Sequence, residues 1–173
     1  MSHLKGKTAL VTGSTSGIGL AMAIGLAKQG VNIMVNGFGE KDAAIAAIKA
    51  CGVEVEYHGA DMSKPIEIED LIKQTEKRFG SLDILVNNAG IQHTANVEDF
   101  PEDKWESIIA INLSSAFYTS HHALPGMKKR NWGRIINIAS VHGLVGSVQK
   151  SAYVAAKHGI VGLTKVTLSL IHI

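Results

Sequence analysis

The chain is poor in cysteine, proline and aromatic residues, and it has little net charge. Its 173 residues include one cysteine, Cys51, so no disulfide can form within the chain, which suits a reducing compartment. The formal net charge is +2, and the one basic run, Lys128-Lys129-Arg130, is most simply a solvated helix end, so we expect no nucleic-acid partner. No apolar run reaches the length of a membrane span and no signal peptide opens the chain. We therefore expect a cytoplasmic protein with no membrane partner.

What the chain does contain is a regular alternation of strand-like and helix-like segments. Hydrophobic residues make up 46% of the sequence and charged residues 18%, as in a globular α/β domain. The predicted strands are 7–12, 31–36, 53–58, 82–87 and 134–139, and the predicted helices are 18–29, 40–50, 65–79, 101–124 and 151–168. Such alternation predicts a parallel sheet with helices on both faces. We expect Pro125-Gly126 to end or kink the fourth of these helices.

A glycine-rich loop follows the first predicted strand. Residues 13–19 read GSTSGIG, and an apolar helical segment comes directly after them. Strand, glycine turn and helix are the context that a dinucleotide-binding loop needs, because the backbone can approach a pyrophosphate that the helix N-terminus attracts. A purely structural turn is the alternative. The candidate cofactor-binding residues here are Gly13, Thr15, Ser16, Gly17, Ile18 and Gly19.

Tyr153 and Lys157 lie one helical turn apart, and Ser140 precedes them in the chain. Side chains four residues apart share one face of a helix. A free tyrosine has a pKa of about 10 and is a poor base near neutral pH. A lysine ammonium beside it favours the phenolate and lowers that pKa. Alone, this spacing is common on solvated helix faces, but downstream of a nucleotide loop it indicates a proton-transfer set.

On these residues the chain resembles the classical short-chain dehydrogenase/reductase family. The segments 12–19 (TGSTSGIG) and 87–90 (NNAG) match its two signatures, and the resemblance extends from about Lys5 to Thr167. It implies a Rossmann-type doubly wound sheet of strand order 3-2-1-4-5 and a homotetramer that uses the long fourth helix and the catalytic helix. The residues that match the family's catalytic tetrad are Asn112, Ser140, Tyr153 and Lys157.

The resemblance also implies a role for each of these side chains. Tyr153 would be the general acid and base, Lys157 would hold the nicotinamide ribose, and Ser140 would orient the substrate oxygen. Asn112 would hold a water that links Lys157 to solvent; the alternative is an amide bonded to backbone at a helix kink. Further cofactor contacts are implied for Asp61, which would accept from adenine, and for Met62, Asn88, Ala89, Gly90 and Tyr153. A helix N-cap shared with Ser63 is the alternative for Asp61.

The end of the second strand favours NAD over NADP. A 2′-phosphate needs a basic partner, and residues 35–39 (VNGFG) offer none, with Lys41 the nearest cation. The acid that usually binds the ribose diol of NAD is absent as well. We expect Asn36 to bond a ribose hydroxyl and Phe38 to pack near the adenosine.

Three polar residues lie beside the catalytic set in the sequence, namely Gln92, His142 and Lys150. An amide, an imidazole and an ammonium together could bind a small carboxylate, although each alone has an ordinary structural explanation. This set resembles that of family members that interconvert (R)-3-hydroxybutyrate and acetoacetate with NAD. Tyr153 and Ser140 complete the implied substrate site.

We find no metal-ligand spacing among the histidines. A reductase of 3-oxoacyl carriers that uses NADPH, and a non-catalytic nucleotide-binding fragment, are the competing interpretations.

The C-terminus departs from the family pattern. Members continue after the Tyr/Lys helix with strands six and seven and a loop over the substrate, and none of these follows here. The last six residues, LSLIHI, match one reading frame of a transposon-end adapter used in sequencing libraries. We therefore expect an N-terminal Rossmann domain at 1–167 and a non-native tail at 168–173. With one sheet edge uncovered, we expect poor solubility and little activity from the chain by itself.

Overall fold

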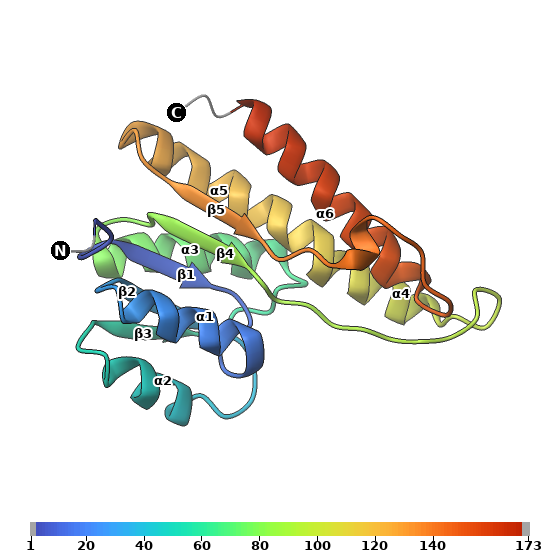
Figure 1. Ribbon diagram of the computed structural model, residues 1–173, viewed down its shortest axis with the longest axis horizontal. Helices are drawn as coiled ribbons and strands as arrows, with labels where there is room; N and C mark the ends of the chain where they lie inside the picture. The colour runs from blue at the N-terminus through green and yellow to red at the C-terminus, as the bar shows by residue number, and fades with distance from the viewer. Residues whose placement is uncertain (1–2, 171–173) are drawn as a thin grey trace.

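Five short strands rich in Val and Ile form one parallel sheet in the structure, a computed structural model that describes residues 3–170. The strands are β1 (Thr8–Val11), β2 (Asn32–Asn36), β3 (Val55–His58), β4 (Ile84–Asn87) and β5 (Arg134–Asn137). They are ordered β3-β2-β1-β4-β5 (Figure 1). The predicted Rossmann-type sheet and its strand order are confirmed. Because β1 and β4 occupy the middle, every residue of both is buried, as expected of strands covered on two faces.

The helices connect these strands. They are α1 (Gly17–Ala27), α2 (Asp42–Lys49), α3 (Pro65–Phe79), α4 (Glu102–Ile109), α5 (Ser115–Lys129) and α6 (Ser151–Leu170), with a π-helical turn η1 (Ala110–Ser114) and a 3-10 turn η2 (Val141–Gly143). Pro65 occupies the first turn of α3, where a missing N–H costs nothing. The predicted helices before residue 100 are confirmed to within two residues at each end.

Two hydrophobic layers cover the two faces of the sheet. Ala9 and Val11 of β1 point to the layer that contains Ala23 and Ala27 of α1 and Ile48 of α2. Leu10, between them, points to the opposite layer. That layer also holds Ile68, Leu71 and Ile72 of α3 with Ala123 and Met127 of α5. The alternation follows from the two-residue period of a strand. The carboxyl ends of the strands are where open α/β sheets bind ligands.

The single helix predicted at 101–124 is wrong in two respects. The segment forms α4, the π-helical turn η1 and α5, and α5 continues past Pro125 to Lys129. A proline inside a helix removes one hydrogen bond, to the carbonyl four residues earlier. That carbonyl belongs to His121, which is exposed, so water can satisfy it. The π-helical turn places one extra residue in the helix, and Asn112 lies within it.

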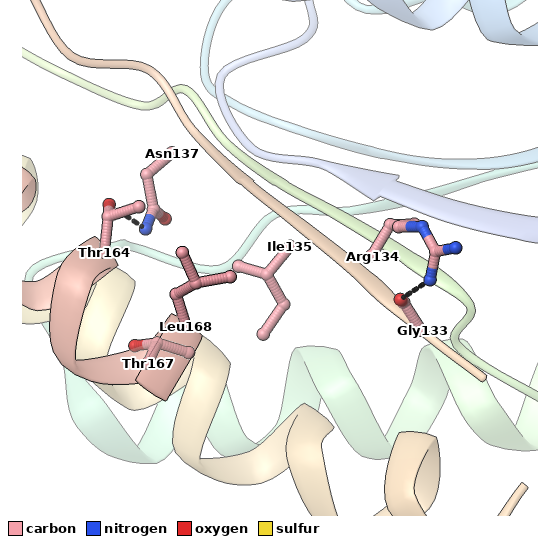
Figure 2. Close-up of a pocket in the computed structure, with 7 residues that line it drawn as sticks. All are labelled: Gly133, Arg134, Ile135, Asn137, Thr164, Thr167 and Leu168. Atoms are coloured by element: carbon pink, nitrogen blue, oxygen red, sulfur yellow. Dashed lines mark hydrogen bonds between the residues drawn. The ribbon is translucent and has the colours of Figure 1, made fainter. Parts of the chain in front are cut away.

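The strand β5 is the edge of the sheet next to α6. Its residues alternate between exposed and half-buried, and Ile136 is 44% exposed. A pocket lies between β5 and the C-terminal half of α6, where Ile135 faces Leu168 and the Asn137 amide donates to Thr164 Oγ1 at 2.9 Å (Figure 2). The helix α6 extends through Leu170, so residues 168–170 of the predicted tail are helical, and the domain boundary at residue 167 stays a prediction. The rest of the predicted tail, 171–173, lies outside the described residues.

Candidate active site

The glycine-rich loop begins where β1 ends and leads directly into α1. Gly17 has a φ of +55°, a conformation that suits glycine, and a Cβ there would project into open space. All six loop residues predicted to bind a cofactor line one pocket at the N-terminus of α1, together with Phe38 and residues 88–90. A helix N-terminus with open space above Gly17 fits a pyrophosphate group. The residues present therefore fit a dinucleotide cofactor.

The two signature segments are tied to each other by hydrogen bonds. Thr12 Oγ1 accepts from the backbone N–H groups of Asn88 and Ala89, both at 3.0 Å. The Asn88 amide in turn donates to the carbonyls of Thr12 and Gly13, at 2.9 and 3.2 Å. The side chain of Asn88 is thus engaged with the loop, so what it contributes to the predicted cofactor site is the loop's shape.

A second pocket lies next to the first, on the β2 and β3 side. Gly13, Asn36, Phe38, Asp61 and Met62 line it with Ala89 and Gly90, so it brings together every residue predicted for the adenosine half. Phe38 is 67% exposed and offers a free apolar face. Asp61 Oδ1 accepts from the N–H and the hydroxyl of Ser63, at 2.9 and 2.8 Å. These two bonds, the backbone bond first, lower the pKa of Asp61, so the carboxylate is anionic at neutral pH.

The predicted contact between Asn36 and a ribose hydroxyl is wrong. The Asn36 side chain is fully buried, and its amide nitrogen donates to the carbonyls of His58 and Ala60, at 3.1 and 3.0 Å. Both amide protons are used inside the protein, because a buried polar group needs a partner. Asn36 therefore shapes the wall of the pocket from behind.

Two of the predicted catalytic residues, Ser140 and Tyr153, lie on either side of His142 where the η2 turn packs against α6. Ser140 Oγ lies 3.5 Å from His142 Nδ1 and accepts from the His142 N–H at 3.2 Å. The His142 and Tyr153 rings meet edge to face with centroids 6.1 Å apart. The close approach depends on Gly143, since a Cβ there would lie 2.7 Å from the Lys157 carbonyl oxygen. The η2 turn can therefore pack against α6 and bring Ser140 and His142 beside Tyr153.

Lys157 lies behind Tyr153 and is 5% exposed. Its Nζ donates to the Ile138 carbonyl at 2.6 Å and lies 5.6 Å from the centroid of the Tyr153 ring. Burial of the ammonium lowers the pKa of Lys157, because the charged form loses solvation. The arrangement holds a cationic group close to the tyrosine and anchors it to the end of β5.

Asn112 is buried in the π-helical turn and pairs with the backbone of Ile91. Its Oδ1 accepts from the Ile91 N–H at 2.8 Å, and its amide donates to the Ile91 carbonyl at 2.9 Å. This is the backbone-bonded amide that the sequence left open as the alternative. Asn112 thereby fixes the segment that follows Gly90 on the side of the predicted substrate site.

The predicted carboxylate-binding residues are less closely associated. Within residues 3–170, no hydrogen bond or ion pair joins Gln92, His142 and Lys150, and Gln92 is exposed. Sequence reasoning missed a link between their segments through Gln149. The Gln149 carbonyl accepts from the Ala95 N–H at 3.0 Å, and its amide donates to Asn96 Oδ1 at 3.2 Å. Gln149 has a φ of +59°, which is uncommon for a residue other than glycine, and the neighbouring sequence does not predict it.

Metal-ligand clusters and membrane-spanning helices were searched for in the part of the chain that the structure describes. No group of three or more His, Cys, Asp or Glu side chains there is arranged to hold a metal ion. No helix from residue 3 to residue 170 is both long and apolar enough to cross a membrane.

Comparison with known proteins settles the family. A family model described as short chain dehydrogenase matches residues 7–170, nearly the whole chain. The chain belongs to the short-chain dehydrogenase family. It is similar to D-beta-hydroxybutyrate dehydrogenases of Cupriavidus necator, 68% identical over 95% of this chain, and of Rhizobium meliloti, 59% identical over 92%. It spans 64% and 63% of the lengths of those two proteins, which is less than two thirds of either.

A solved structure from Sinorhizobium meliloti, a candidate short-chain alcohol dehydrogenase, has the same fold as this chain. The TM-score is 0.91 at 32% sequence identity, over 94% of this chain and 66% of that one. The family is one of oxidoreductases that use a nicotinamide cofactor, and the residues predicted to bind one line two adjoining pockets here.

Proposed function

We propose that this chain carries the cofactor site and the catalytic residues of an NAD-dependent dehydrogenase that interconverts (R)-3-hydroxybutyrate and acetoacetate. The observation that carries the proposal is the convergence of Ser140, His142 and Tyr153 beside buried Lys157, at the same sheet edge as the glycine-rich loop. The similarity to two proteins named D-beta-hydroxybutyrate dehydrogenase supports this choice of substrate.

In oxidation, Tyr153 takes the proton of the substrate hydroxyl at its phenolate oxygen, and in reduction it returns that proton. Ser140 Oγ donates to the same substrate oxygen and holds it within reach of the tyrosine. Lys157 stabilises the phenolate through its charge and is positioned by the Ile138 carbonyl. When bound, the nicotinamide supplies the acceptor or donor of the hydride at C3 of the substrate. The bonded pair of Asn112 and Ile91 keeps the neighbouring segment in place.

The substrate carboxylate is bound by Lys150, His142 and Gln92. Lys150 is half-buried directly before α6, and His142 reaches the site through its contact with Tyr153. These three side chains do not bond to one another, and their polar groups other than His142 Nδ1, which pairs with Ser140 Oγ, are available to a ligand. A carboxylate bound there would place C3 and its hydroxyl toward Ser140 and Tyr153.

The proposed cofactor is NAD. A 2′-phosphate would need a basic side chain, and none is present among the residues that line the pockets around Phe38. Lys41, the cation nearest to residues 35–39 in the sequence, has its Nζ 4.4 Å from the centroid of the Tyr57 ring, in a cation–π contact. Ser63 does not use Asp61 Oδ2, which lies 3.9 Å from Lys64 Nζ; at that distance the oxygen can still accept from the adenine amine.

The proposal includes a homotetramer for the whole protein. The outer faces of α4 and α5 expose large aromatic side chains, with Trp105 at 41% and Phe117 at 50%. Exposed large aromatic side chains on these successive helices suit a self-complementary interface. Light scattering of the whole protein checks this, and a monomer at micromolar concentration would contradict it.

The test is NAD reduction, followed by absorbance, with (R)-3-hydroxybutyrate. It is carried out on the 173-residue chain and on a version extended by the part of the Cupriavidus necator relative that lies C-terminal to the matched region. We expect turnover from the extended version and little from the chain alone, because a site open to water loses catalytic power. If neither version turns over although both bind NADH, the substrate assignment is wrong.

A further inference from the structure

The wall of the adenosine-side pocket is built from irregular backbone. After His58, the last residue of β3, the chain runs through Gly59 to Ala60, Asp61 and Met62, which line the pocket. A segment without secondary structure has backbone groups that need other partners. Here those partners are side chains.

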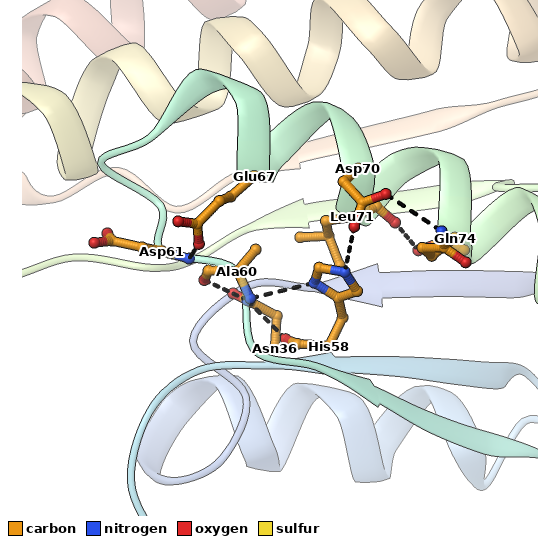
Figure 3. A network of polar contacts seen from close by, with 9 residues as sticks. Asn36, His58, Ala60, Asp61, Glu67, Asp70, Leu71 and Gln74 are labelled. Atoms are coloured by element: carbon orange, nitrogen blue, oxygen red, sulfur yellow. Dashed lines mark hydrogen bonds and ion pairs between the residues drawn. The ribbon is translucent and has the colours of Figure 1, made fainter.

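Three side chains hold this segment in place (Figure 3). His58 Nδ1 accepts from the Ala60 N–H at 3.2 Å, and the Asn36 amide donates to the Ala60 carbonyl at 3.0 Å. Glu67 of α3 accepts from the Asp61 N–H at 2.8 Å. Both polar groups of the Ala60 backbone are therefore bound by side chains from two different strands, β3 and β2.

The contacts of His58 also determine its tautomer. Because Nδ1 accepts a hydrogen bond, the imidazole proton lies on Nε2, which donates to Asp70 Oδ2 at 3.0 Å. Asp70 also accepts from Gln74, at 3.3 Å, and hydrogen bonds from Gln74 and His58 lower its pKa. The Asp70 carboxylate on α3 thus holds the His58 ring in the orientation that leaves Nδ1 free to accept from Ala60.

We propose that His58 is a positioning residue for the adenosine half of the cofactor, acting through the Ala60 N–H and oriented by Asp70. The inference rests on the proposed cofactor site. His58 touches the backbone of the pocket wall and not the ligand, so its removal loosens Ala60 and Asp61 and weakens binding of any ligand that contains adenosine diphosphate. The ligand class is an adenine dinucleotide or its ADP-ribose half.

The test compares His58→Ala with His58→Asn in the 173-residue chain. The asparagine Oδ1 takes the place of Nδ1 and can accept from Ala60, but it cannot reach Asp70. The probes are ADP-ribose and NADH, with affinities measured by calorimetry. Losing one neutral hydrogen bond of about 1 kcal/mol predicts a decrease in affinity of about fivefold for His58→Ala. We expect the same factor for both probes and wild-type-like affinity for His58→Asn.

The control is Lys73→Ala, which removes an ion pair with Glu69 on the same helix as Asp70 without touching the pocket wall. It should bind both probes as the wild type does. Equal affinities for wild type and His58→Ala overturn the role of His58 and leave the cofactor site intact. An equal loss in His58→Asn also overturns it, because acceptance from Ala60 would then be irrelevant. If the wild type binds neither probe, the proposed cofactor site is wrong and this inference with it.

Discussion

The nucleotide side and the substrate side of this site are built differently. The nucleotide side consists of the loop 13–19 and the segments 36–38 and 58–62. Its backbone is held by buried or partly buried hydrogen bonds with the side chains of Thr12, Ser14, Asn36 and His58. The substrate side consists of the segments 91–100 and 141–150. It exposes a series of apolar side chains, with Val97 at 76%, Val141 at 65%, Leu144 at 73% and Val148 at 86%.

This difference separates two kinds of mutational effect. Where a polar side chain holds buried backbone, its loss costs folding free energy and cofactor affinity together. Where side chains stand in solvent beside the catalytic residues, their loss costs turnover or substrate affinity and leaves stability unchanged. The predictions below follow from this distinction.

The largest effect is expected from Tyr153→Phe. General acid–base catalysis contributes about 10²- to 10⁴-fold, so we expect kcat of the extended version to fall by about 10³-fold. The Tyr153 hydroxyl bonds to no other group among the described residues, so the melting temperature should stay unchanged. Steady-state kinetics and thermal unfolding measure both quantities. Tyr118→Phe on α5 is the matched control, and a variant of Tyr153 that keeps wild-type turnover would refute the mechanism.

The next effect should appear in stability and not in chemistry. Asn36→Ala leaves the carbonyls of His58 and Ala60 without their donor, which costs about 2–3 kcal/mol of unfolding free energy. Urea unfolding measures this loss. Asn32→Ala on the same strand removes a solvent-exposed bond to the Glu54 N–H and should cost about 0.5 kcal/mol. Equal losses of unfolding free energy in the two variants would show that the Asn36 hydrogen bonds do not stabilise the nucleotide side.

The sequence predicts the features that depend on neighbouring residues, and it does not predict those that depend on contacts between distant residues. Strands, helices and the loop 13–19 follow from local patterns, and the predicted sheet is confirmed. The roles of Asn36 and His58 do not follow from local patterns, because the Asn36 amide meets its partners 22 and 24 residues away. The helix α5 can continue past Pro125 because the carbonyl of His121, which loses its hydrogen-bond donor, can reach water. The sequence alone does not predict the exposure of His121. The positive φ of Gln149 likewise depends on its bond to Ala95 across the site.

On the substrate side, Lys150→Ala should affect one substrate and not another. A charge-assisted hydrogen bond of about 2 kcal/mol predicts an increase in KM for (R)-3-hydroxybutyrate of about thirtyfold. KM for a neutral secondary alcohol and the melting temperature should not change. Lys165→Ala, an exposed lysine further along α6, serves as the control. An equal rise in KM for both substrates would mean that Lys150 does not bind the carboxylate.

The smallest effect links the two sides through Lys157. Because burial lowers its pKa in the folded state, the folded protein binds fewer protons than the unfolded chain over the alkaline range below the ordinary lysine value of about 10.4. The burial cost is therefore fully present below the folded pKa, and stability recovers as pH rises from that pKa toward the unfolded value. Relative to Lys157→Met, the wild type should gain up to about 1 kcal/mol as pH rises toward this limit. Urea unfolding of both proteins at a series of pH values from neutral to alkaline measures the difference, with Lys165→Met as a solvent-exposed control. If the two curves run parallel, Lys157 is solvated in the folded protein, and its contact with the Ile138 carbonyl does not desolvate the charge.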